Sequence, residues 1–302
     1  MTSTSQRAYL IVNADDYGYF PNVSRGILKS AAEGIVTATG VLSNTHCFVE
    51  HAAWLRDHDT LDVGVHLNLT TQRPLSMDMT KKFSSRGGEF PGKFSIFRAL
   101  MSGMITLDNI RTEWAAQVER SLASGLRPKF LNSHEHIHML PPLLSLTRDL
   151  ARQYAIPHVR FSTTELGEWS LRGSAIIRGT IIKGLEIMNR RDKNFPTPDF
   201  LGIGQSGSLN LSYLKNKISR LRPGNIYELM CHPGHRNDQH IIDPRIARYH
   251  DWEGELNTLT NPVTKDLLLE HGIQLIGYRH LHIEQGRLVV RELHANCTPI
   301  QY

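Results

Sequence analysis

The sequence has 302 residues, of which 40% are hydrophobic and 21% charged, and this balance excludes a disordered chain and favours one globular domain spanning residues 1–302. The formal net charge is +5, but the Lys and Arg residues are scattered and form no basic run, so we expect no nucleic-acid partner. No apolar stretch reaches the ~18 residues that a membrane-spanning helix needs, and we expect no membrane partner.

The cysteine pattern and the start of the sequence indicate a compartment. Cys47, Cys231 and Cys297 are an odd number without CxxC spacing, which argues against a disulfide framework or a structural zinc site. The first residues pass directly into the apolar segment AYLIVN, without the basic region, long apolar stretch and cleavage site of a secretion signal. Both observations predict a reducing, cytoplasmic location.

Short apolar segments with β-branched residues alternate with segments of helical periodicity along the chain. This alternation predicts βα units around a parallel sheet, either open or closed into a barrel. Strands are expected at residues 9–13, 36–42, 61–67, 129–133, 158–161, 225–231 and 273–277. Helices are expected at residues 22–33, 109–124, 142–154, 211–221 and 262–271.

Two long segments and one short one depart from this alternation. Residues 70–107 and 232–261 are polar, rich in turn residues and too long for ordinary connections, so we expect them to pass over the mouth of an active site. Near the end, HIEQGRLVVREL predicts a hairpin that turns at Gln285 and Gly286.

Polar residues follow several of the predicted strands at the point where each strand ends. Because the C-terminal ends of parallel strands share one face of the sheet, these residues should converge there although they lie far apart in the sequence. They are Asp15, Asp16, His66, His134 and His232.

The two aspartates allow two interpretations. Asp15 and Asp16 could cap a helix, because a carboxylate there accepts backbone N–H groups. Alternatively, one carboxylate binds a cation while its neighbour, pointing another way, acts as a base. His66 by itself is more typical of a hydrogen-bonded core histidine than of a ligand.

The segment SHEHIHM is harder to explain by packing, because His134, His136 and His138 alternate directly after a strand. Imidazoles are common ligands of zinc and similar ions, so the cluster predicts a nearby cation. Not all three histidines can be ligands, and we expect one or two of them to orient neighbours or hold substrate.

Three further residues stand at strand ends. His232 could serve as a general acid, and a polar loop histidine is the alternative. Cys231 is interpreted as a buried strand cysteine rather than a nucleophile, because an Asp and His metal site activates water without it. Arg160 could pair with Asp15 and keep that carboxylate ionised, or it could be an ordinary surface arginine.

The motifs VNADDYG, GVHLNLT, NSHEHIHMLP and MCHPGH, in this order, resemble those of the YdjC-like carbohydrate deacetylases. The resemblance implies a distorted TIM-like (β/α) barrel and hydrolysis of the acetamide of N-acetylated sugars such as chitin disaccharides. Carried over by motif, it implies Asp16, His66 and His134 as metal ligands, Asp15 as catalytic base and His232 as proton donor.

The resemblance also implies one divalent metal ion, an N-acetylated sugar as partner and a homodimer. Members of the family are associated with magnesium and zinc, and two imidazoles favour zinc or another transition ion such as cobalt or manganese. Asn132 and Glu135 depart from the family pattern and bear on metal preference. Residues 166–201 match no motif. Tyr17, Phe90 and Trp252 are candidates to stack on sugar rings, with ordinary packing as the alternative.

Two other functions compete with this one. Histidine clusters at strand ends also serve metal-dependent phosphoesterases, and the positive net charge suits anionic substrates. The sequence contains neither a P-loop nor a glycine-rich phosphate cradle, which argues against that function. The third alternative is a non-catalytic module that binds a sugar or a metal.

Overall fold

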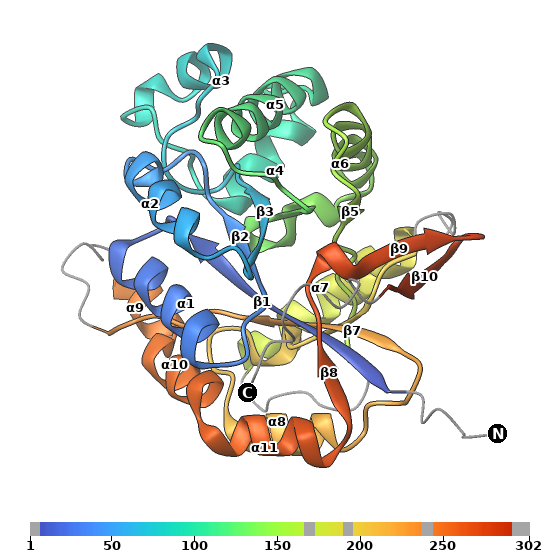
Figure 1. Ribbon diagram of the computed structural model, residues 1–302. Helices are drawn as coiled ribbons and strands as arrows, with labels where there is room; N and C mark the ends of the chain where they lie inside the picture. The colour runs from blue at the N-terminus through green and yellow to red at the C-terminus, as the bar shows by residue number, and fades with distance from the viewer. Residues whose placement is uncertain (1–6, 166–172, 190–195, 237–243, 292–302) are drawn as a thin grey trace.

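The structure is a computed structural model that describes residues 7–165, 173–189, 196–236 and 244–291. At its centre lies a parallel sheet, which curls into a half-barrel surrounded by helices (Figure 1). This arrangement confirms the predicted α/β fold. The strands of the sheet are β1 (Ala8–Tyr17), β2 (Ala38–Val41), β3 (Asp62–Leu67), β4 (Phe130–Ser133), β5 (His158–Val159), β6 (Asp199–Leu201), β7 (Ile226–Cys231) and β8 (Ile273–Leu275).

The strand order is β5-β4-β3-β2-β1-β7-β6, so the first strand in the chain lies near the middle of the sheet. One edge of β1 pairs with β7. The other edge is shared, because β8 pairs with residues 8–10 and β2 pairs with the later part of the strand. Buried on both faces, β1 has the continuous apolar sequence expected of a central parallel strand.

Two hydrophobic clusters pack the helices onto the sheet. One cluster joins β1, β7 and β8 to α1, α8 and α11, and the other joins β3 and β4 to α3, α4, α5 and α6. In Figure 1, α3, α4, α5 and α6 lie above the curled sheet, and α1, α8 and α11 lie below it. The helices are α1 (Pro21–Glu33), α2 (Phe48–Trp54), α3 (Met77–Lys82), α4 (Lys93–Met101), α5 (Leu107–Ala123), α6 (Pro141–Gln153), α7 (Gly173–Asn189), α8 (Leu211–Ile218), α9 (Pro244–Tyr249), α10 (Trp252–Thr260) and α11 (Pro262–Glu270).

Local sequence explains where several helices begin. A proline in the first turn of α1, α6 and α11 sets a helical backbone angle at a position that needs no N–H donor. Helix α5 begins with a capping box, in which the Thr106 hydroxyl accepts the Asn109 N–H and the Asn109 amide oxygen accepts the Thr106 N–H.

The predicted connections contain more regular structure than the sequence indicated. Residues 70–107 include α3 and α4, and the described part of residues 232–261 includes α9 and α10. Strand β6 and helix α7, both in the unassigned residues 166–201, were also not predicted. Beyond the sheet, β9 (Leu281–Glu284) and β10 (Arg287–Val290) form the expected hairpin, with positive φ at Gln285 and Gly286 as a two-residue turn requires.

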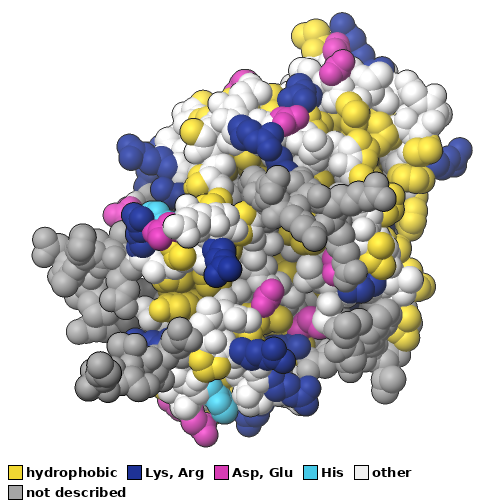
Figure 2. All heavy atoms as spheres, turned by 90° about the vertical axis from the view of Figure 1, so that its right-hand side faces the viewer, with side chains coloured by type: hydrophobic (Ala, Val, Ile, Leu, Met, Phe, Trp, Pro, Cys, Tyr) yellow, Lys and Arg dark blue, Asp and Glu magenta, His cyan; other side chains and the backbone are white. Residues whose placement is uncertain are grey.

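The surface drawn in Figure 2 carries its Lys and Arg side chains in separate groups, interspersed with uncharged and hydrophobic surface. Among the helices of the described ranges, none combines the length and apolar character needed to cross a membrane.

Candidate active site

The predicted polar residues lie at the C-terminal ends of neighbouring strands. Asp15 and Asp16 are near the C-terminal end of β1, and His66 is near the end of β3. His134 begins the 3-10 helix His134–Met139 directly after β4. His232 follows the last residue of β7. Because these strands run parallel in one sheet, their ends share one face, as the sequence indicated.

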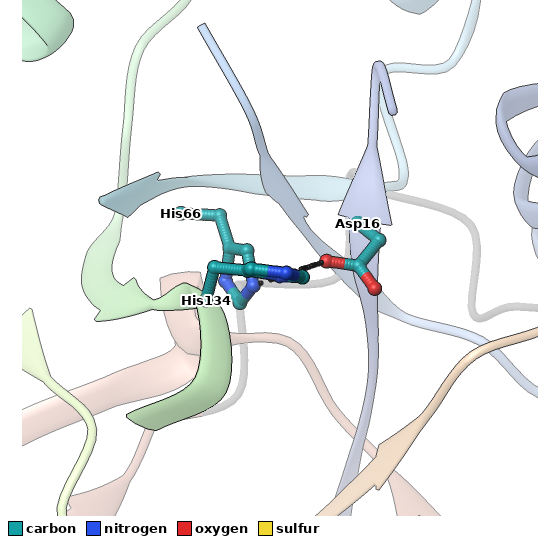
Figure 3. A group of neighbouring side chains, drawn as sticks. All are labelled: Asp16, His66 and His134. Atoms are coloured by element: carbon teal, nitrogen blue, oxygen red, sulfur yellow. Dashed lines mark hydrogen bonds and ion pairs between the residues drawn. The ribbon is translucent and has the colours of Figure 1, made fainter. Parts of the chain in front are cut away.

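Asp16, His66 and His134 point towards one another (Figure 3). The Asp16 Oδ1 atom lies 3.3 Å from His66 Nε2 and 2.8 Å from His134 Nδ1. One ligand atom from each residue lies within 4.8 Å of the other two. These are the three residues predicted to hold a metal.

The donor set fits a divalent transition ion. Zinc binds imidazole nitrogen and carboxylate oxygen at about 2.0–2.2 Å, so neighbouring ligand atoms in a tetrahedral site lie roughly 3.3 Å apart. The distance of 3.3 Å from Asp16 Oδ1 to His66 Nε2 agrees with this value, whereas the 2.8 Å from Oδ1 to His134 Nδ1 is a hydrogen-bond distance. Three protein ligands leave a position for water or substrate, as in catalytic rather than structural zinc sites.

The backbone of β1 aims the carboxylates. Asp16 has a φ of 71°, which is rare for a residue other than glycine, and the pairing of β1 with β2 shifts register between Ala14 and Tyr17. Such an irregularity bends the strand and redirects a side chain. Gly18, with a φ of 89°, continues the turn, and a Cβ atom there would lie 3.1 Å from the Leu42 carbonyl oxygen.

Asn132 orients His66 and contacts Asp15 at the same time. Its amide nitrogen donates to Asp15 Oδ1 at 2.9 Å, so its amide oxygen faces His66 Nδ1 at 2.8 Å. His66 Nδ1 therefore carries a proton and donates it to Asn132, and Nε2 is the nitrogen that faces Asp16. Gly40 leaves room for this contact, because a Cβ atom there would lie 3.1 Å from both bonded atoms. The sequence marked Asn132 only as a departure from the family.

Burial and charge oppose each other at the metal-ligand cluster. Burial disfavours the charged Asp16 carboxylate, but His134 and His66 outweigh burial and hold the pKa of Asp16 well below its usual value. Burial also disfavours a charged His134, yet the adjacent Asp16 raises the pKa of His134 to about 9. A cation that binds His134 must therefore displace a proton.

Asp15 lies beside this cluster and is saturated with hydrogen bonds. Arg160 donates to Asp15 Oδ2 at 2.6 Å and to Oδ1 at 3.1 Å, and Asn13 donates to Oδ1 at 2.7 Å. Arg160 also donates to Glu228 Oε1 at 2.7 Å. Burial favours the neutral acid, but the Arg160 and His66 charges prevail and hold the pKa of Asp15 well below its usual range.

This arrangement realises the pairing of Arg160 with Asp15 that the sequence suggested. Glu228, in β7, was missed, although a carboxylate within the apolar run IYELMC signals a buried partner. Because Arg160 bridges two buried carboxylates, one on each side, its guanidinium has a fixed orientation.

His232 lies on a turn that is anchored from two sides. Its backbone N–H donates to Glu255 Oε2 at 2.5 Å. A Cβ atom on Gly26 would lie 2.4 Å from the Gly234 Cα, so only glycine lets α1 pack this closely against the turn. The imidazole is 7% exposed, and its Nδ1 has no hydrogen-bond partner among the described residues. Burial lowers the pKa of His232.

His136 and His138 support the loop instead of facing Asp16. His138 Nε2 donates to the Arg160 carbonyl at 3.1 Å, and its Nδ1 pairs with Ser133 Oγ at 2.6 Å. His136 Nδ1 pairs with Ser162 Oγ at 2.8 Å. Burial lowers the pKa of His138 to about 3. These histidines therefore tie the turn after β4 to the segment after β5.

Other candidates lie in the core. The Tyr17 hydroxyl donates to the His51 carbonyl at 2.7 Å, and burial raises the pKa of Tyr17. Phe90 packs against Phe83, and Trp252 stacks on His250. These contacts agree with the packing alternative for all three aromatic residues. Cys231 is a buried strand cysteine, as interpreted, and Cys297 lies outside the described residues.

The segment 70–107 contacts the loop that carries His134. Lys93, the first residue of α4, pairs with Glu135 at 2.7 Å, and Glu135 adjoins His134. The buried Tyr19 makes an edge contact with the His134 ring at a centroid distance of 5.7 Å. An exposed ion pair and a buried aromatic ring therefore flank the proposed metal ligand.

Comparisons with known proteins show which family the chain is similar to. The profile of the family described as YdjC-like protein matches residues 9–270. A carbohydrate deacetylase of Geobacillus stearothermophilus is 32% identical over 284 residues, which cover 91% of this chain and 98% of that relative. A chitooligosaccharide deacetylase of Klebsiella pneumoniae is 31% identical and covers 89% of this chain and 98% of its own length.

A solved structure is similar to this chain over most of its length. A crystal structure of an Enterococcus faecalis protein, 25% identical, matches with a TM-score of 0.68 over 90% of this chain and 98% of that one. The family match over residues 9–270 includes all five predicted site residues, Asp15, Asp16, His66, His134 and His232. The chain therefore belongs to the YdjC-like family.

Proposed function

We propose that this protein is a metal-dependent hydrolase that removes the acetyl group from an N-acetylated amino sugar. One observation carries the proposal: Asp16, His66 and His134 converge beside a buried aspartate that Arg160 keeps ionised. Relatives named carbohydrate deacetylase and chitooligosaccharide deacetylase, which match about nine tenths of the chain, support the substrate class.

Asp16, His66 and His134 would hold the ion, for which zinc suits the two imidazoles and the carboxylate best. When bound, a divalent ion polarises the acetyl carbonyl and lowers the pKa of a water molecule towards neutrality. The Asn132 amide oxygen accepts the Nδ1 proton of His66, which leaves Nε2, the nitrogen that faces Asp16, as the one that would bind the ion.

Asp15 is the proposed general base. Arg160 holds it in the ionised form and fixes its orientation, so that it accepts the proton of the attacking water as the C–O bond forms. His232 is the proposed general acid, which donates a proton to the nitrogen as the C–N bond breaks. The products are acetate and the free amino sugar, and the atoms of one water molecule are divided between them.

An acetate-release screen tests the proposal. N-acetylated mono-, di- and oligosaccharides would be incubated with the protein and zinc, magnesium, cobalt or manganese in turn. We expect acetate from at least one sugar with at least one metal, and far slower acetate release from the Asp15→Asn variant. Phosphate release from sugar phosphates without acetate release would instead favour a phosphoesterase. Tight binding of intact sugar with no acetate under every metal would favour a non-catalytic module.

A further inference from the structure

A cavity of about 570 Å³ opens at the end of the sheet opposite the candidate active site. It is lined by the short helix Leu55–Asp57, the turn before β3, the connection between α5 and β4, and Arg279. Asp62 begins β3, and His66 lies four positions later, roughly 13 Å along an extended strand. The cavity is therefore separate from the proposed metal ligands.

Basic side chains outnumber acidic ones around this cavity. Arg279 and Asp62 cancel each other, because the Arg279 Nε donates to Asp62 Oδ1 at 2.6 Å and its backbone N–H donates to Oδ2 at 2.8 Å. Three cations then face one carboxylate, which leaves a net charge of +2. The remaining cations are Arg56, Arg127 and Lys129, and the remaining carboxylate is Asp59.

These three cations have no ion-pair partner among the described residues, in contrast to Arg160 and Arg279. Arg56 and Arg127 are exposed, and Lys129 is half-buried. The Lys129 backbone N–H donates to the Val63 carbonyl at 2.7 Å, which fixes this residue at the cavity wall. The local charge is therefore available to a ligand.

The floor of the cavity is apolar. Leu55, Leu61 and Leu126 line it and are themselves buried. Small-molecule sites have volumes of about 300–1,000 Å³ and combine apolar walls with a few convergent polar groups. A ligand that suits this cavity has a doubly negative group for the rim and an apolar body for the floor.

We propose that this cavity binds a small phosphate monoester. A phosphate monoester carries close to two negative charges at neutral pH, which matches the net charge left by the unpaired side chains. Guanidinium groups bind phosphate oxygens in pairs, and two of the three unpaired cations are arginines. This site is independent of the proposed deacetylase reaction, because none of its residues contacts Asp16, His66 or His134.

Calorimetric titration of the full-length, metal-loaded protein tests this site. Phenyl phosphate and inorganic phosphate are the probes, because they share the anion and differ in the apolar body. Arg127→Glu and, separately, Arg56→Glu each reverse one positive charge at the cavity. Lys215→Glu on α8 is the matched control, because it reverses an exposed positive charge away from the cavity. Circular dichroism establishes that each variant is folded.

We expect phenyl phosphate to bind the wild type more tightly than inorganic phosphate does. Arg127→Glu and Arg56→Glu should each weaken binding about tenfold or more, which corresponds to the loss of one charge-assisted contact, while Lys215→Glu binds like the wild type. The proposal is overturned if phenyl phosphate does not bind, if it binds no more tightly than inorganic phosphate, or if both cavity variants bind like the control. The last result would place the anion at the metal.

Discussion

Charged side chains are arranged differently at the two ends of the sheet. At the C-terminal ends, charged groups are buried and each is matched by another, as Asp15 is by Arg160 and Asp16 by His134. At the N-terminal ends, Arg56 and Arg127 face solvent without an ion-pair partner in the described chain. Buried charges need complementary partners, whereas exposed ones do not. Substitutions at the C-terminal ends should therefore have much the larger effects.

The largest effect is expected from His66→Ala, which removes a proposed metal ligand. Two remaining ligands should not retain the ion, so metal content by elemental analysis should fall to background and acetate release should stop. His158→Ala is a suitable control, because His158 is a buried histidine at the other end of the sheet. Unchanged metal content in His66→Ala would remove this residue from the ligand set.

Asp15→Asn separates metal binding from proton transfer. The amide keeps the shape of the side chain but cannot accept the proton, so turnover should fall by about two orders of magnitude or more. Metal content should stay near that of the wild type, because Asp15 is not among the clustered ligands. A fully active Asp15→Asn enzyme would refute its assignment as the base.

Asn132→Ala tests a residue that acts through its neighbours. Without the amide oxygen that holds its Nδ1 proton, His66 can rotate or change tautomer, so metal affinity should fall by roughly 10- to 100-fold. Titration with zinc in competition with a chelator measures this change. Excess metal should restore part of the activity of Asn132→Ala, and failure to do so would indicate a different role.

The location of these residues could be predicted because the C-terminal ends of parallel strands share one face of the sheet, so that only the strand positions had to be known. Asp15, His66 and His134 each follow an apolar run, which the sequence shows directly. Glu228 and Asn132 were missed as partners, because a polar residue inside a strand reveals burial but not which group satisfies it. Tyr17 was a candidate to stack on a sugar ring with packing as the alternative, and its buried hydrogen bond to the His51 carbonyl agrees with packing.

Two of the elements that the sequence did not predict are short. Helix α3 has 6 residues and β6 has 3, so neither is long enough to show a hydrophobic period in the sequence. The turn residues and charges of residues 70–107 indicated loops, yet α4 buries Ile96 and Ala99 against the core. Tertiary packing therefore decided the structure of these segments.

Acid stability tests the neutral histidines that support the site. The pKa of His138 is about 3 in the folded protein, compared with 6.5 for an ordinary histidine. Because the pKa of His138 is lower in the folded than in the unfolded protein, His138 makes its full contribution to the free energy of unfolding above pH 6.5. This contribution is lost as the pH falls towards 3. As the pH falls from 6.5 to 4.5, His138 should lower the free energy of unfolding by on the order of 2 kcal/mol.

Urea unfolding at several pH values measures the effect of His138. His138→Gln should be less stable than the wild type at pH 7, because it loses part of the contact to Ser133 and the Arg160 carbonyl. It should nevertheless lose less stability than the wild type between pH 6.5 and 4.5. Equal decreases in the unfolding free energy of the two proteins over this pH range would show that folding does not lower the pKa of His138.

Lys93→Ala should have the smallest effect, although its partner adjoins a proposed metal ligand. The Lys93 side chain is 51% exposed and that of Glu135 is 30% exposed, so water screens the attraction between these two groups and hydrates them when the pair is broken. We expect a change below about 1 kcal/mol in unfolding free energy and less than about fivefold in kcat/KM. Losses as large as those of Asn132→Ala would mean that this surface pair, unlike other exposed pairs, fixes the turn that carries His134.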